Sequence, residues 1–219
     1  WFECDIVRIG AEQEMVLVDQ KTLKPACINM AALEHMTEWP WVETELAKFN
    51  HEINLDPREF SGNAFRAMEE EMSSKLSRIE GVVNKLGATI VLTGILPTLR
   101  KYDLEMSNLT PKQRYFALME AINQQLVGST YELNMVGIDE LQIKHDSPLL
   151  EAVNTSFQVH LQVSPQQFAP MYNLAQALSA PVMALAANSP IVFGRRLWHE
   201  SRIAMFQQAL DTRSTHDHM

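Results

Sequence analysis

Three segments far apart in the chain alternate in character with a period of two, and this alternation constrains the fold most. Residues 6–19, 49–55 and 157–164 each alternate mainly apolar or β-branched side chains with others. In the second and third segments the intervening positions are wholly polar: Asn50, Glu52 and Asn54 in one, and Gln158, His160, Gln162 and Ser164 in the other. A strand of this kind packs one face on a core and turns the other toward solvent or a site. The pattern therefore predicts an antiparallel sheet.

Helices are predicted where apolar residues recur every three or four positions, or where a Ser-Pro or Thr-Pro pair indicates a helix start. They span residues 64–86, ending at Gly87, residues 110–126, residues 165–187, divided into two pieces by Pro181, and residues 199–210. A short buried strand is expected at residues 88–92. The order lacks the regular alternation of a doubly wound fold, so we expect an α+β class with helices packed on one face of the sheet. With no repeat, linker or low-complexity tract, residues 1–219 are expected to form a single domain.

Charge and composition narrow the class of function. The chain of 219 residues has a net charge of −9, which argues against gripping nucleic acid or an anionic membrane and suits a metal site. No apolar run approaches the roughly 20 residues of a membrane helix. The two cysteines, Cys4 and Cys27, lack the spacing of a disulfide framework or a zinc site, which favours a cytoplasmic location. The absence of an initiator Met and of an obvious finishing element suggests a piece of something longer.

Glu12 and Glu14 are the first candidate metal ligands. Two residues apart on a strand, their side chains leave the same face about 7 Å apart along the backbone. Like charges at that distance raise each other's pKa, and a hard divalent ion such as Mg²⁺ relieves the repulsion. Because G-x-E-x-E is a short pattern, an exposed strand edge with two ordinary glutamates remains the alternative.

Three further residues are candidates for the same site. Glu52 lies on the polar face of its strand, and the alternative is an ordinary glutamate on an exposed strand. Glu45, which precedes that strand, could add a second acid, and the alternative is an ordinary surface residue. His160 shares a polar face with Gln158 and Gln162 and could bind metal or stabilise phosphoryl oxygens, whereas a hydrogen-bonded structural histidine is the alternative.

Arg202 is the basic candidate, with Arg195 and Arg196 nearby in sequence. An arginine fork can hold a carboxylate or a phosphate, and a surface salt bridge is the alternative. The sequence contains no G-x-x-x-x-G-K-[ST] loop, no G-x-G-x-x-G fingerprint and no G-x-S-x-G elbow, so nucleotide binding must use another design and nucleophilic hydrolysis is unsupported.

Five segments in order together resemble the glutamate–cysteine ligase family, in particular its bacterial carboxylate–amine ligase branch with a glutamine-synthetase-like fold. They are Gly10-Ala11-Glu12-Gln13-Glu14, Phe49-Asn50-His51-Glu52-Ile53-Asn54, Gly94-Ile95-Leu96-Pro97, Ser156-Phe157-Gln158-Val159-His160, and Ala186-Ala187-Asn188-Ser189-Pro190 followed by Gly194 and Ser201-Arg202.

The resemblance implies a ligase that uses ATP to activate the γ-carboxylate of glutamate as an acyl phosphate, which an amine such as cysteine then attacks. It implies that Glu12, Glu14, Glu52 and, less directly, Glu45 bind Mg²⁺ or Mn²⁺, with Glu12, Glu52 and His160 around the nucleotide. Arg202 would bind substrate. The implied partners are small molecules, with no nucleic acid and no membrane, and a homo-oligomer is left open.

Family members continue beyond this point and supply another acid and an arginine, so we expect these residues to form the N-terminal part of a ligase catalytic domain with an incomplete site. Two other functions remain open. One is a non-catalytic binding or regulatory module that retains the fold, which a scattered arrangement of Glu12, Glu14, Glu52 and His160 would favour. The other is a metal-dependent phosphohydrolase, which would release phosphate without an added amine.

Overall fold

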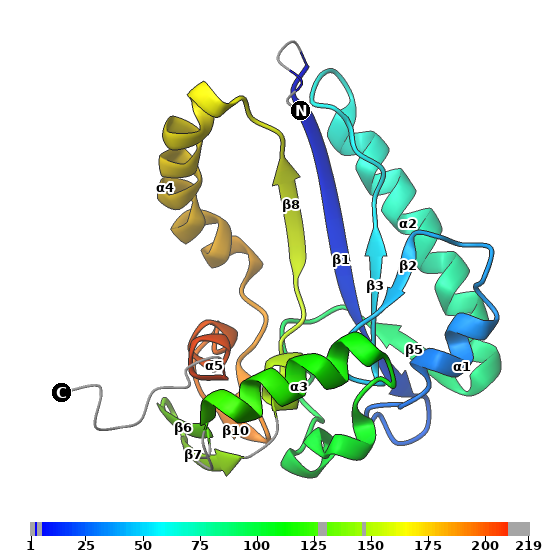
Figure 1. The fold of residues 1–219 in the computed structure, drawn as a ribbon, viewed down its shortest axis with the longest axis vertical. Helices are drawn as coiled ribbons and strands as arrows, with labels where there is room; N and C mark the ends of the chain where they lie inside the picture. Colours follow the sequence, from blue (N-terminus) through cyan, green and yellow to red (C-terminus); the bar gives the residue numbers. More distant parts are fainter. Residues whose placement is uncertain (1–2, 4–5, 127–130, 146–147, 210–219) are drawn as a thin grey trace.

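The structure, a computed structural model, describes Glu3 and residues 6–126, 131–145 and 148–209 (Figure 1). Cys4, Leu210 and the C-terminal residues 216–219, which entered the expectations above, lie outside the described residues.

The main sheet has six strands, and each is antiparallel to the strand it pairs with. They are β1 (Arg8–Asp19), β2 (Val42–Thr44), β3 (Asn50–Asn54), β4 (Arg58–Glu59), β5 (Ala88–Val91) and β8 (Phe157–Leu161). The long strand β1 is the centre, because β3, β4, β5 and β8 all pair with it. The mixed α+β class and the antiparallel sheet are confirmed.

One face of this sheet is covered by α1 (Asn29–Glu34) and α2 (Ala64–Val83). The odd-numbered residues of β1, such as Met15 and Leu17, are fully buried there against Ile79 and Val83 of α2. Burying a side chain of this size stabilises the fold by about 1.5–3 kcal/mol. The turn η1 (Asn84–Leu86) ends the helix at Gly87, whose φ of 78° is left-handed, as expected for a C-terminal glycine.

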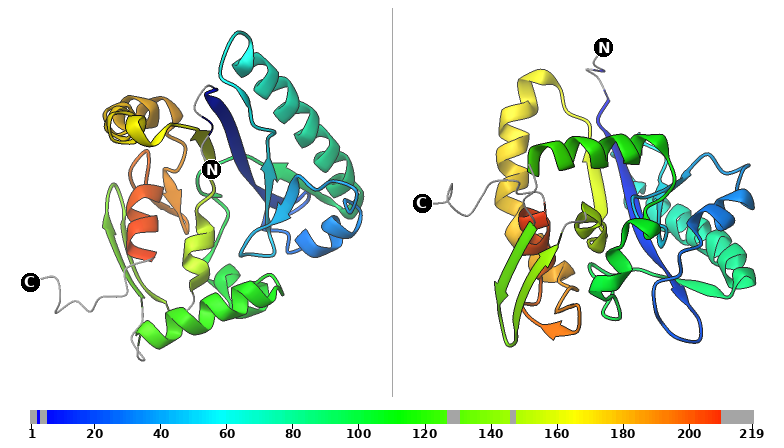
Figure 2. Two further views of the ribbon diagram at one scale, coloured as in Figure 1. Left: turned by 45° about the horizontal axis from the view of Figure 1, so that its top comes forward. Right: turned by 60° about the horizontal axis from the view of Figure 1, so that its bottom comes forward.

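A second core lies on the other face, at the end of β1 that carries Val16 and Val18, so helices pack on both faces of the sheet and not on one as expected. It is enclosed by α3 (Gln113–Leu126), the hairpin β6 (Tyr131–Val136) and β7 (Glu140–His145), the 3-10 helix η4 (Pro148–Val153) and α5 (Arg202–Ala209). The short elements η2 (Lys101–Leu104), η3 (Met106–Asn108), β9 (Ile191–Val192) and β10 (Arg195–Arg196) complete this end of the molecule, seen from below in Figure 2. The other end of the same face stays polar.

Two predicted helix boundaries are wrong. The helix expected at Thr110 begins at Gln113, because the Thr110 hydroxyl donates to the carbonyl of Glu45 at 2.6 Å instead of capping a helix. Pro181 does not divide the helical stretch: after η5 (Pro165–Gln167), α4 runs unbroken over Phe168–Ala186 with Pro181 inside it.

The third predicted strand is shorter and less covered than expected. It ends at Leu161, and its apolar residues Phe157 and Val159 are 48% and 57% exposed. A cavity of about 180 Å³ separates them from Phe65, Met68 and Met72 of α2. On the outer side of β8 stands α4, away from the rest of the sheet (Figures 1 and 2). Among the helices described, none is both long and apolar enough to cross a membrane.

Candidate functional site

The register of the sheet brings the acids of two strands, β1 and β3, to one surface. Glu14 of β1 pairs with Glu52 of β3, and Glu12 lies between Asn54 of β3 and Gln158 of β8. Directly paired residues of antiparallel strands project from the same face, so these side chains leave the sheet on the side opposite α2. The structure thus brings Glu12, Glu14 and Glu52 together.

Two further carboxylates lie within electrostatic range of this group. Glu45 follows β2 and interacts with Glu52 and Glu14, and Glu151 of η4 interacts with Glu14 and Glu45. We call the five residues Glu12, Glu14, Glu45, Glu52 and Glu151 the acidic face.

Burial and mutual repulsion make charge costly on the acidic face. Burial, followed by repulsion from neighbouring glutamates, raises the pKa of Glu45 and of Glu52 to about 7. Burial and the charge of Glu14 raise the pKa of Glu151 to about 7 as well. At neutral pH these carboxyl groups are therefore close to half protonated, and a cation would draw them into the charged form.

Glu14 is the acid held most firmly by hydrogen bonds. Its two carboxylate oxygens accept from the amide and the hydroxyl of Ser156, both at 3.0 Å, while its own amide donates to the Ser156 carbonyl at 2.9 Å. Burial raises the pKa of Glu14, and the bonds from Ser156 act in the opposite direction. Ser156 therefore fixes the direction in which this carboxylate points.

His160 lies at the rim of the same surface. It pairs with Gly10 across the β1–β8 ladder, and its Nε2 is 3.3 Å from a Glu12 oxygen. Its side chain is 55% exposed, against 28% for Glu12. A histidine in this place can approach a bound molecule from solvent without leaving the carboxylate beside it.

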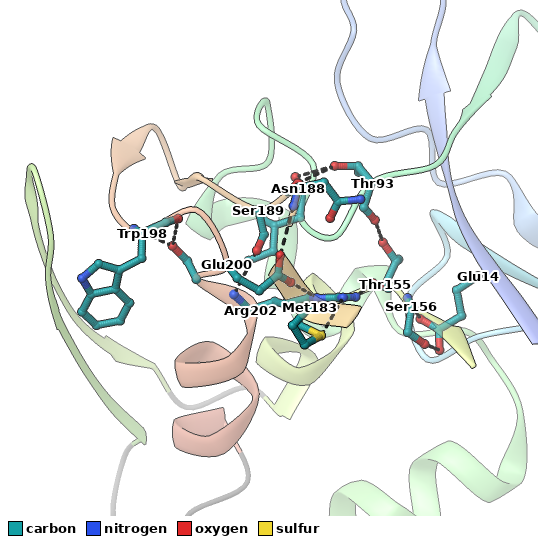
Figure 3. Close-up of polar contacts among 12 residues, drawn as sticks. Glu14, Thr93, Thr155, Ser156, Met183, Asn188, Ser189, Trp198, Glu200 and Arg202 are labelled. Atoms are coloured by element: carbon teal, nitrogen blue, oxygen red, sulfur yellow. Dashed lines mark hydrogen bonds and ion pairs between the residues drawn. The ribbon is translucent and has the colours of Figure 1, made fainter. Parts of the chain in front are cut away.

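Arg202 lies apart from the acidic face, in a polar cluster with Glu200, Ser189 and Thr155 (Figure 3). Its guanidinium forms an ion pair with Glu200 and donates to the Thr155 carbonyl at 3.1 Å. The other two arginines belong to β10, where Arg196 forms a bidentate pair with Asp139. The structure therefore does not group Arg202 with the exposed Arg195 and Arg196, and the substrate-binding role of Arg202 stays a prediction.

Sequence reasoning missed three residues of this region. Glu151 and Ser156 lie outside any strand, in segments whose path the alternation does not predict. Arg114, at the start of α3, has its Nη2 3.6 Å from a Glu43 oxygen and interacts electrostatically with Glu45. For Ser156 the available signals were its place in the segment that resembles the family and its position next to the Phe157–His160 alternation.

The acidic face suits hard divalent cations in its chemistry. Its donors are carboxylate oxygens, the ligands that Mg²⁺ and Mn²⁺ prefer, and their raised pKa values indicate charge that the protein alone does not compensate. Within the part of the chain that the structure describes, no three such groups already converge as closely as a single ion requires. Binding would therefore draw the side chains inward by rotation about their flexible χ angles.

Comparison with known proteins identifies the family. The sequence profile of glutamate-cysteine ligase family 2 (GCS2) matches residues 8–216, nearly the whole chain. The chain belongs to this family. No curated protein matches the chain. Membership in GCS2 makes a ligase-like enzyme the supported class, and it agrees with the family that the five sequence segments indicated.

The GCS2 segments without acids also meet in space. Thr93 and Gly94 contact Asn188, and Thr155 joins Thr93 to Arg202. A Cβ on Gly94 would lie 2.5 Å from Asn188 Oδ1 and 3.2 Å from side-chain carbons of Ser189 and Arg202, so a larger residue here would displace these side chains. The motifs of this GCS2 chain thus form two neighbouring groups, the acidic face and the polar cluster around Arg202.

Proposed function

We propose that this chain carries an ATP- and metal-dependent carboxylate–amine ligase activity that joins the γ-carboxylate of glutamate to an amine such as cysteine. The observation that carries the proposal is the grouping of Glu12, Glu14 and Glu52 on one sheet surface in a GCS2 member. The proposal includes a cytoplasmic location and a role in making γ-glutamyl compounds such as glutathione precursors.

In this proposal Glu12, Glu14, Glu45 and Glu52 hold Mg²⁺ or Mn²⁺, and Glu12, Glu52 and His160 lie next to the nucleotide. Bound divalent ions supply positive charge that screens the phosphates of ATP. Glu45 and Glu52 change from half protonated to charged as they bind the ion, and Ser156 keeps Glu14 oriented while they do so. His160 donates toward a phosphoryl oxygen from the rim. The γ-phosphoryl group passes to the glutamate carboxylate, and the amine then displaces phosphate.

A thermal-shift experiment tests the order of binding. We expect Mn²⁺ to raise the melting temperature, and ATP to add to the rise only when metal is present, because the acids repel the triphosphate alone. Equal stabilisation by ATP in the presence of a chelator would count against the acidic face as the nucleotide's anchor. In the variant Glu52→Gln, which removes one charge from the acidic face, the stabilisation by Mn²⁺ should be smaller. The matched control is Glu34→Gln, which removes the charge of an exposed residue on α1.

Product analysis tests the reaction. ADP formation should require glutamate, an amine and metal together, and γ-glutamylcysteine should accumulate in step with ADP when cysteine is the amine. Phosphate release that needs no amine would indicate a phosphohydrolase instead. Metal-dependent binding of ATP without any ADP formation would favour a non-catalytic module.

A further inference from the structure

Arg202 occupies the centre of a network in which each of its three guanidinium nitrogens has a partner. Its Nε pairs with Glu200, its Nη1 donates to the Thr155 carbonyl at 3.1 Å, and its Nη2 lies 3.9 Å from the Met183 sulfur (Figure 3). Its side chain is 20% exposed and that of Glu200 is 11% exposed. A bidentate contact to a substrate carboxylate needs two parallel N–H groups, and the Nε–H of this fork is already held by Glu200.

The network continues on the other side of Glu200. The second oxygen of Glu200 accepts from the Asn188 amide at 3.0 Å, and the Arg202 amide donates to the Ser189 hydroxyl at 3.2 Å. The segment that follows α4 is thereby tied to the start of α5. Arg202 is thus anchored at its backbone as well as at its guanidinium, so its position relative to Thr155 is fixed.

Thr155 leads from this network to the acidic face. Its amide donates to the Gly94 carbonyl at 3.0 Å, its hydroxyl donates to the Thr93 carbonyl, and its own carbonyl accepts from Arg202. The next residue is Ser156, which holds both oxygens of Glu14. The Thr155 carbonyl that Arg202 holds and the Ser156 amide that donates to Glu14 belong to the same peptide group.

We infer that Arg202, together with Glu200, is a positioning pair that fixes the Thr155–Ser156 backbone and, through Ser156, the orientation of the Glu14 carboxylate on the acidic face. The inference deepens the proposed function and rests on it only where metal binding is the readout. Groups that orient a metal ligand typically affect metal affinity by 10–100-fold when they are removed.

Two variants and their combination test the link. Arg202→Met removes the contact to Thr155, and Ser156→Ala removes one bond to Glu14. We expect each variant to raise the Kd for Mn²⁺ by about tenfold or more, measured by calorimetric titration. The Kd of the double variant should not exceed the higher of the two single-variant Kd values. The matched control is Arg66→Met, which removes a 72%-exposed arginine of α2 and should leave the affinity unchanged.

A second readout needs no metal. Hydrogen exchange of the Ser156 amide should be faster in Arg202→Met than in the parent chain, whereas amides of α2 should keep their rates. Should Arg202→Met fail to fold, Arg202→Lys replaces it, since lysine can pair with Glu200 but lacks the second arm that reaches Thr155.

Three results would overturn the inference. One is an unchanged Ser156 exchange rate in the Arg202 variants. Another is additivity of the Arg202 and Ser156 effects on Mn²⁺ affinity. The third is loss of glutamate affinity in Arg202→Met with Mn²⁺ affinity intact, which would make Arg202 a substrate-binding residue. Failure of the proposed function looks different. In that case the parent chain would show no Mn²⁺ binding, or Mn²⁺ binding that Glu52→Gln does not weaken. The hydrogen-exchange experiment would still decide the role of Arg202.

Discussion

At the scale of single residues, Glu52 combines a raised pKa with a place on the acidic face beside Glu12 and Glu14. Glu52→Gln keeps the size of the side chain and removes one charge. We expect the stability of the metal-free protein at pH 8 to stay the same or rise, because repulsion from Glu12 and Glu14 is relieved. Mn²⁺ affinity should fall by about tenfold or more, equivalent to about 1.4 kcal/mol. Calorimetry giving equal affinities for the two proteins would remove Glu52 from the site.

Glu151 offers a second test at the same scale, because no sequence pattern pointed to it. Its charge contributes to the raised pKa of Glu45. Glu151→Gln should therefore lower the pKa of Glu45, which carboxyl-carbon NMR titration would measure. Glu120→Gln, an exposed change on α3, should leave that titration where it is. An unmoved Glu45 titration in the Glu151 variant would show that the two carboxylates do not interact.

At the scale of elements, a glycine after the end of α2 and a glycine inside α2 should respond oppositely to replacement by alanine. Gly87 has φ of 78° and open space around its missing Cβ, so Gly87→Ala adds backbone strain without a clash. We expect it to destabilise the protein by about 1 kcal/mol in urea unfolding. Gly81 lies inside α2, also with open space, and Gly81→Ala should stabilise by up to about 1 kcal/mol. The same sign for both substitutions would contradict this assignment of the helix end.

The elements also show how far the sequence leads. The two faces of β1 and β3 follow from alternation alone, since apolar Ile53 and polar Glu52 must point in opposite directions. The Arg202 cluster could not be derived in this way, because it joins loops through backbone carbonyls such as that of Thr155, which sequence patterns do not display. The hairpin β6–β7 was missed although Leu133 and Met135 alternate with polar neighbours.

At the scale of the whole molecule, the acidic face makes stability depend on pH. The carboxyl pKa values of Glu45, Glu52 and Glu151 are about 7 in the folded protein, above the 4.5 of an ordinary glutamate. The folded protein therefore binds more protons than the unfolded chain between these values. This contribution to stability is complete below about pH 4.5 and is lost as the pH rises through about 7.

We accordingly expect the melting temperature of the metal-free protein to fall between pH 5 and pH 8 in calorimetry, and Mn²⁺ to remove most of that fall. Glu52→Gln should flatten the profile in the absence of metal, whereas Glu34→Gln should reproduce the parent profile. Profiles of the same slope in the parent chain and in Glu52→Gln would contradict the raised pKa of Glu52.

The pairing of β1 with β8 has a kinetic consequence. Glu14 and Ser156 are 142 residues apart in the chain, whereas β3 follows β1 closely. Contacts that close long loops lose more chain entropy and tend to form late. We therefore expect the carboxylates of β1 and β3 to come together early in refolding, and Glu14 to gain its serine partner only in the slowest phase. Divalent ions added during refolding would then first bind carboxylates of β1 and β3 that are not yet oriented. They would bind the complete acidic face only after Ser156 has fixed Glu14.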